Sequence, residues 1–119
     1  MALIFRVYFL LNIETSKESI QVIKDIIALK TDIETKRFPT LGSKVEKAQL
    51  LLNQLFQVPI TDSKEVSEFL QISPSTVNRL IKDLIELNIL FELTGYKRNG
   101  KYIFREYFII FHRELEYKN

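Results

Sequence analysis

Residues 60–93, ITDSKEVSEFLQISPSTVNRLIKDLIELNILFEL, decide the fold of this chain. Asp62 is followed three residues later by Glu65, a pairing typical of a helix N-terminus, and the helix it opens must end near Gln71. Ser73 is a second N-cap candidate, with Pro74 at the first helical position, where the missing N–H of proline costs nothing. The stretch therefore predicts a short helix, a tight turn and a second helix over residues 74–87.

Each of these two helices carries apolar residues at helical spacing. The short helix should turn Val66, Phe69 and Leu70 inward. Asn88 stands where a left-handed C-terminal cap would follow the second helix. The predicted inner face of the second helix consists of six residues: Val77, Leu80, Ile81, Leu84, Ile85 and Leu87.

Two β-rich runs, residues 89–94 and 101–105, follow on either side of Asn99-Gly100. Asn-Gly favours the primed turn of a β-hairpin, so the runs are predicted to pair in antiparallel fashion. The apolar tail at 107–111 is compatible with a strand or a helix by its length. The neighbouring Glu106 and the charged end of the chain favour a closing helix.

Upstream, a helix is predicted over residues 43–57, with Ser43 as its cap and Glu46 completing a capping box. Its apolar face should hold Val45, Ala48, Leu51, Leu52, Leu55 and Phe56. Residues 35–43 contain Phe38-Pro39 and Leu41-Gly42, which is typical of a linker. We therefore expect a boundary near Gly42, with a helical segment at 1–42 and a second domain at 43–119.

The N-terminal segment is predicted to form two helices. Residues 3–13 are apolar almost all round, and residues 16–33 have a face made of Ile20, Ile23, Ile26, Ile27 and Ala28. The apolar run is too short to span a membrane, which takes about 20 residues, and it contains Arg6. It also lacks the charge order of a signal peptide, so we expect a cytoplasmic protein that does not enter a membrane. Its excess of apolar surface predicts a homodimer through the N-terminal helices.

The composition of the 119 residues excludes several kinds of chemistry. The chain has no cysteine and one histidine, His112, so disulfides, thiolate nucleophiles and His or Cys metal clusters are ruled out. His112 is expected to pack among its aromatic neighbours, and we assign it no catalytic role. The scattered carboxylates are typical of solvated helix faces and the glycines form no phosphate loop, so no cofactor and no metal are expected.

In order, the predicted elements are those of a winged helix-turn-helix, so the fold class is mainly helical with a small antiparallel hairpin. In such a fold the second helix of the turn can enter the major groove while the wing reaches the phosphates. The candidate DNA-binding residues are therefore the polar positions on the outer face of that helix and the cations of the wing: Ser75, Thr76, Asn78, Arg79, Lys82, Lys97, Arg98 and Lys101. A polar outer face and a charged hairpin tip also occur for solubility alone. Asp83, Glu86 and a net charge of only +2 weigh against a nucleic-acid surface.

The same region resembles the C-terminal winged-helix region of Fic family proteins. The resemblance covers about half of the chain and runs through KEVSEFLQIS (64–73), STVNRLIKDL (75–84), NIL (88–90), ELTG (92–95), KRN (97–99) and Tyr102. Residues 8–10, 12–13 and 19–29 are similar to the helices that follow the Fic catalytic motif. Phe5 and Arg6 depart from that pattern, where the family has tryptophan and an aliphatic residue.

Fic enzymes transfer AMP to hydroxyl side chains with a His-Pro-Phe loop followed by Gly-Asn-Gly-Arg, and neither piece occurs in this sequence. The resemblance thus implies a non-catalytic chain, a C-terminal fragment or truncated relative of a protein adenylyltransferase. Two functions stay open. One is a DNA-binding winged helix, and the other is a protein-interaction or dimerisation module that positions or regulates an upstream Fic catalytic domain.

Overall fold

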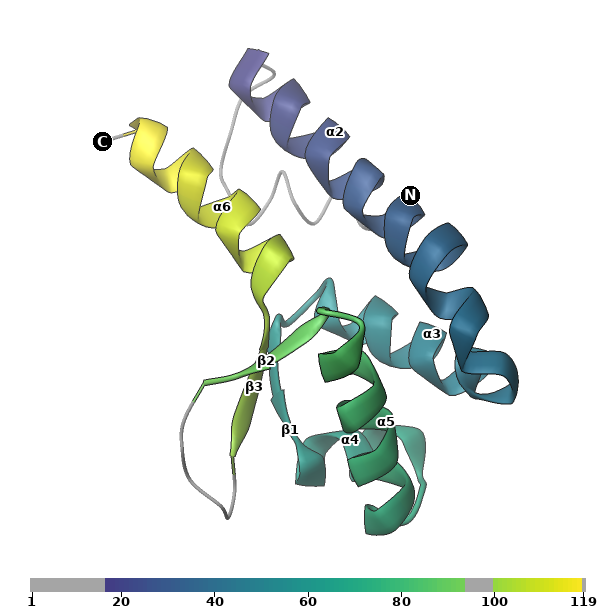
Figure 1. Ribbon diagram of the computed structural model, residues 1–119. Helices are drawn as coiled ribbons and strands as arrows, with labels where there is room; N and C mark the ends of the chain where they lie inside the picture. Colours follow the sequence, from purple (N-terminus) through teal and green to yellow (C-terminus); the bar gives the residue numbers. More distant parts are fainter. Residues whose placement is uncertain (1–16, 94–99, 119) are drawn as a thin grey trace.

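The computed structural model describes residues 17–93 and 100–118, and the side chains of residues 20–93 and 100–112. The described chain starts with a long helix, turns through a π-helical and a 3₁₀ segment, and continues into alternating short helices and strands (Figure 1). The elements are α2 (Lys17–Asp32), η1 (Ile33–Arg37), η2 (Phe38–Lys44), α3 (Val45–Leu55), β1 (Ile60–Asp62), α4 (Ser63–Leu70), α5 (Pro74–Glu86), β2 (Leu90–Glu92), β3 (Lys101–Phe104) and α6 (Arg105–Lys118).

The predicted helix-turn-helix is confirmed with both of its caps. The side chain of Asp62 accepts a hydrogen bond from the Glu65 amide at 2.8 Å, and Ser73 Oγ accepts one from the Thr76 amide at 3.3 Å. Gln71 ends α4 in the left-handed region at φ 55°, and Asn88 follows α5 at φ 61°. These local signals therefore define the start and the end of both helices.

The hairpin is also confirmed, but it belongs to a sheet of three antiparallel strands in the order β1-β3-β2. Ile103 of β3 lies between Ile60 of β1 and Phe91 of β2. The sequence predicts a short extended piece between the helices α3 and α4, and β1 forms there. Its pairing with β3 as a third strand was not predicted, because three residues are too few to show an alternation. The tip of the hairpin, residues 94–99, lies outside the described residues.

The order α3-β1-α4-α5-β2-β3 is that of a winged helix-turn-helix, so the predicted fold class is confirmed. Its core lies between α3, α5 and the sheet and continues onto α6. Tyr107 at the start of α6 packs against Phe56 and Phe104, with ring centroids 4.9 and 5.5 Å apart, and its hydroxyl donates to the Phe56 carbonyl at 2.7 Å. This aromatic contact joins the closing helix to α3 and β3.

Several predicted core positions were wrong. Phe69 and Ile85 are exposed, because α4 buries Val66 and Leu70 and α5 buries a narrower stripe than expected. On α2 the buried side chains are Val22, Ile26, Leu29 and, one residue beyond it, Ile33, whereas Ile20, Ile27 and Ala28 of the predicted face are exposed. In each case the sequence showed more apolar positions than the neighbouring elements can cover.

The predicted linker at residues 35–43 is also wrong, because η1 and η2 are helical and Phe38 is buried. Gly42 still interrupts the helical run, with φ 60° and ψ −124°. Ser43 lies within η2, so α3 starts from Lys44 without any side-chain cap, and the predicted capping box does not form. A boundary between domains near Gly42 stays a prediction.

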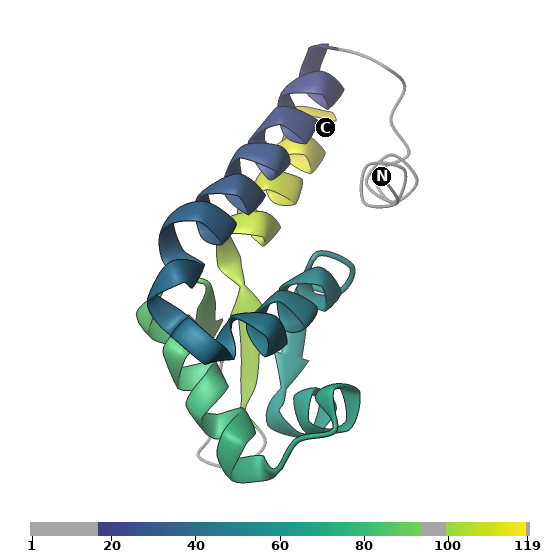
Figure 2. The ribbon, with the colours of Figure 1, turned by 90° about the vertical axis from the view of Figure 1, so that its right-hand side faces the viewer.

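Helices α2 and α6 pack side by side and run in opposite directions (Figures 1 and 2). The tail is thus a helix, as predicted, and it connects the N-terminal segment to the winged helix. The helix predicted over residues 3–13 lies outside the described residues. Within the part of the chain that the structure describes, no helix has both the length and the apolarity needed to cross a bilayer.

Candidate nucleic-acid interface

Helix α5 is held by its inner face and leaves the opposite face to solvent. Val77, Leu80, Ile81 and Leu84 are buried against the rest of the winged helix. The five polar residues predicted for the outer face are all exposed: Ser75, Thr76, Asn78, Arg79 and Lys82. Their placement follows from the helical period of the apolar residues alone.

The first turn of α5 contains a cluster of hydroxyl groups. Ser73 Oγ lies 3.2 Å from Ser75 Oγ and 2.9 Å from Thr76 Oγ1, in addition to capping the Thr76 amide. A hydroxyl can donate one hydrogen bond and accept two. Ser75 and Thr76 therefore keep capacity for a further partner while they hold the start of the helix.

Unlike the hydroxyl groups of the first turn, the side chains of Asn78, Arg79 and Lys82 offer all of their hydrogen-bonding groups to a ligand. Among the described residues, none of these three side chains has a hydrogen-bond or ion-pair partner. Asn is suited to adenine edges and Arg to guanine edges, whereas Lys meets phosphates as a point charge. The exposed middle of α5 thus presents one amide and two cations.

The acidic residues of α5 lie toward its C-terminal end, and one of them is compensated. Lys44, the last residue of η2, donates to Asp83 Oδ2 at 2.9 Å. Glu86 in the last turn is exposed. The repulsion that Asp83 would exert on a phosphate is therefore reduced by a cation from another element.

Of the three cations predicted for the wing, the structure describes one. Lys97 and Arg98 lie outside the described residues. Lys101 at the start of β3 is exposed, and its ammonium group donates to Asp62 Oδ2 at 3.0 Å. This contact raises the pKa of Lys101, and the pKa of Asp62 is lowered, chiefly by the Glu65 amide. Lys101 is thus already paired, which the sequence could not show because the two residues are far apart in the chain.

One residue that the sequence analysis did not single out holds the base of α5 in place. Arg37 at the end of η1 donates to Asp32 at 2.9 Å, to both oxygens of Glu106 at 2.7 and 3.2 Å, and to the Leu87 carbonyl at 3.3 Å. The Glu106 contact is the main reason that the pKa of Arg37 is raised. Arg37 therefore joins the N-terminal segment, the end of α5 and the start of α6.

The described residues offer little support for a catalytic histidine or a metal site. His112 is exposed and stacks on Phe108 with a centroid distance of 5.5 Å. Among the side chains described, those of residues 20–93 and 100–112, no three from His, Asp or Glu come together in a way that could hold a metal ion. The exposed outer face of α5 therefore stands as the candidate site among the described residues.

Comparison with known proteins adds no family to this description, because no family model and no curated protein matches the sequence.

Proposed function

We propose that the winged helix binds double-stranded DNA with α5 in the major groove. Asn78 and Arg79 contact base edges, with Ser75 and Thr76 at the first turn, and Lys82 contacts a phosphate. Lys97 and Arg98 of the wing reach the neighbouring backbone, and Lys101 joins them by exchanging its contact with Asp62 for a phosphate. The observation that carries this proposal is the outer face of α5, where exposed Asn78, Arg79 and Lys82 have no partner among the described residues.

The placement of the charges supports this proposal. Arg79 and Lys82 are three residues apart, so they lie on neighbouring positions of one helix face. Recognition helices contact base edges mainly with their N-terminal residues, and the acidic Glu86 lies in the last turn, away from that half. The Lys44 contact with Asp83 further lowers the negative charge beside the cations.

The test is a fluorescence-anisotropy titration of a labelled mixed-sequence duplex at three or more salt concentrations. Arg79→Ala and Lys82→Ala are compared with Lys24→Ala, which removes the same charge from an exposed position on α2. We expect Arg79→Ala to weaken binding roughly 5- to 150-fold, and Lys82→Ala to lower the slope of log K against log salt by about one. Lys24→Ala should bind like the unmodified chain.

Two results would contradict the proposal. One is the absence of binding at low salt. The other is binding that Lys24→Ala weakens as much as Arg79→Ala, because such binding would depend on net charge and not on α5. A further comparison uses duplexes selected from a random pool, on which Asn78→Ala should relax the preference at one position.

The alternative is that the module acts on proteins. The contacts of α2 with α6 and of Arg37 with Glu106 favour it, because such contacts would fix the orientation of an attached domain. On the resemblance, that domain would be an upstream Fic AMP-transferase domain, which the winged helix positions or regulates. This alternative predicts no salt-sensitive binding of duplex DNA and a complex with a Fic catalytic domain in analytical ultracentrifugation.

We also propose that the chain forms a homodimer through its N-terminal helices. The apolar residues at 3–13 and the exposed Ile20 and Ile27 of α2 support this proposal. Light scattering from micromolar to millimolar protein should show a dimer. A monomer over the whole range would contradict it.

A further inference from the structure

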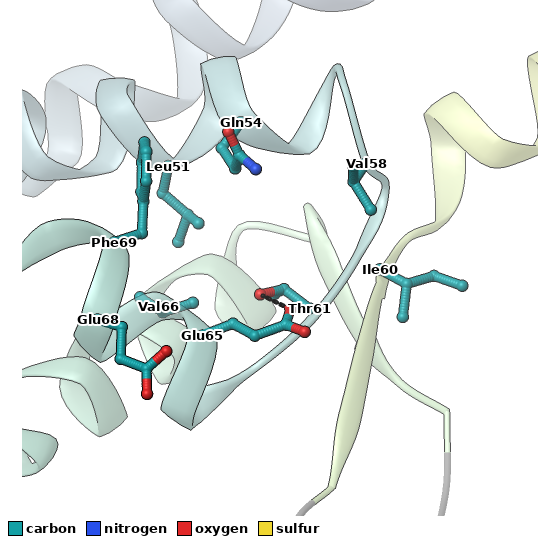
Figure 3. Close-up of a pocket in the computed structure, with 9 residues that line it drawn as sticks. All are labelled: Leu51, Gln54, Val58, Ile60, Thr61, Glu65, Val66, Glu68 and Phe69. Atoms are coloured by element: carbon teal, nitrogen blue, oxygen red, sulfur yellow. Dashed lines mark hydrogen bonds between the residues drawn. The ribbon is translucent and has the colours of Figure 1, made fainter. Parts of the chain in front are cut away.

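A groove lies between α3, β1 and α4 and has a volume of about 470 Å³. Figure 3 shows Leu51 of α3 along one side, Val58 and Ile60 at one end, and Phe69 of α4 at the other end. Leu51 is buried, whereas Val58 and Phe69 are each 49% exposed. The groove thus has a buried apolar floor and an exposed apolar rim. Its volume lies within the usual range of ligand-binding pockets, so it can accept a large side chain.

The exposure of Phe69 is unusual for its residue type. Aromatic side chains bury well in cores, and single exposed apolar residues are ordinary, but here three of them surround one hollow. Aromatic residues, phenylalanine among them, are enriched in protein interfaces relative to the rest of the surface. The rim of Val58, Ile60 and Phe69 is therefore a surface suited to a protein partner.

The charges of the groove indicate the chemistry of that partner. Glu65 and Glu68 of α4 line it, and no cation among the described residues does. Among the described residues neither carboxylate forms an ion pair, although Glu65 accepts a hydrogen bond from Thr61 at 3.3 Å and lies within the field of Lys101. Two carboxylates repel phosphate, so the groove does not continue the DNA-binding face of α5. They attract an ammonium or guanidinium group instead.

We propose that this groove binds an amphipathic helix of a partner protein, with an apolar side chain between Phe69 and Val58 and Lys or Arg side chains against Glu65 and Glu68. Helices dock into such grooves through apolar residues at i, i+3, i+4 and i+7. The groove is formed by α3, β1 and α4, whereas the proposed DNA-binding face belongs to α5 (Figure 2). A partner can therefore bind without covering Arg79.

The probe is a synthetic helix of about 15 residues with Leu and Phe at i, i+3, i+4 and i+7 and Lys elsewhere. Two control peptides replace Lys by Glu, or keep the composition and scatter the apolar residues around the helix. The full chain is titrated and followed by amide chemical shifts. Because its net charge is +2, overall charge does not attract the cationic peptide. We expect saturable shifts at groove residues with the first peptide only.

The variants separate the apolar and the charged contributions. Phe69→Ala should weaken binding at least roughly tenfold, as expected when an aromatic side chain that the partner covers is removed. Glu65→Gln and Glu68→Gln should weaken it less and reduce its salt dependence. Ile109→Ala and Glu46→Gln, which are exposed positions outside the groove, are the matched controls and should have no effect.

Three outcomes would overturn the proposal. The first is equal binding of the Lys and Glu peptides, and the second is binding that Phe69→Ala leaves unchanged. The third is self-association of the chain that Phe69→Ala abolishes, because the groove would then hold a second copy. If Phe69→Ala does not fold, Glu68→Lys takes its place, since it alters only an exposed charge and should still weaken the Lys peptide.

Discussion

Replacing Arg37 by Ala should loosen the connection between α2 and the winged helix. The guanidinium group contacts Asp32, Glu106 and the carbonyl of Leu87, which come from three separate parts of the chain. Among the described residues, Arg37 is the cation that joins elements over the longest sequence separation. Its loss should therefore affect both the global stability and the packing of α2 on the rest.

The size of the effect follows from the burial of the partners. The Arg37 side chain is 20% exposed and that of Glu106 is 40% exposed, so the contact is intermediate between a surface pair and a buried one. Surface pairs contribute up to about 1 kcal/mol, and hydrogen bonds to charged groups about 1.5–3 kcal/mol. Because Asp32 and Glu106 can be hydrated again after the substitution, the larger cost of a stranded buried charge does not apply. We expect a loss of about 2–3 kcal/mol in the free energy of unfolding.

The assay is urea unfolding followed by circular dichroism, with Lys36→Ala as the control. Lys36 also contacts Asp32, but at 3.7 Å and with a side chain that is 78% exposed, so its loss should cost less than about 0.5 kcal/mol. Arg37→Lys should lose most of the stabilisation, because an ammonium group cannot form the two parallel bonds to Glu106. A double-mutant cycle with Glu106→Gln should give a coupling energy of about 1–2 kcal/mol.

A result near zero would refute this reasoning. If Arg37→Ala unfolds within about 0.5 kcal/mol of the unmodified chain, the contacts contribute no more than an ordinary surface pair. A coupling energy near zero between Arg37 and Glu106 would show that the loss arises from other contacts of the arginine. High salt should lower the stability of the unmodified chain more than that of Arg37→Ala, because it screens a pair that the variant lacks.

Two further outcomes follow from the hydrogen bonds of the core and of the cap. Tyr107→Phe should cost about 2 kcal/mol in thermal unfolding, because it leaves the buried Phe56 carbonyl without its 2.7 Å donor, whereas Tyr102→Phe in the half-buried part of β3 should cost little. Asp62→Ala should cost about 1 kcal/mol near neutral pH, because it removes the N-cap of α4. The Glu65 amide holds the pKa of Asp62 below the ordinary 3.8, so the charge of Asp62 stabilises the fold above that value and stops doing so as the pH falls through the lower folded pKa. The difference in stability between this variant and the unmodified chain should therefore shrink in acid, and a constant difference from pH 7 to pH 2 would contradict the reasoning.

Much of the winged helix could be predicted because its signals are local. A cap and the amide that donates to it are three residues apart, and the buried stripe of α5 repeats within a few turns. The positions of α5 that do not belong to this buried stripe form its outer face. The candidate site residues on this helix were therefore predictable, including their exposure, from the sequence alone.

The remaining features depend on residues that meet only after the chain has folded. Strand β1 has three residues and exists because β3 pairs with it, and Lys101 and Lys44 each find a carboxylate 39 residues away. Arg37 reaches Glu106 across 69 residues.

Burial likewise depends on which neighbours are present. Phe69 has the helical spacing of a core residue, but α3 and β1 leave an open groove beside it. The sequence by itself thus determined the N-caps of α4 and α5, the helical spacing of the buried residues on α5 and the outward face of that helix. These features depend on neighbours within a few residues. The tertiary structure decided which charges are paired and which apolar side chains stay exposed, because those depend on contacts between distant segments.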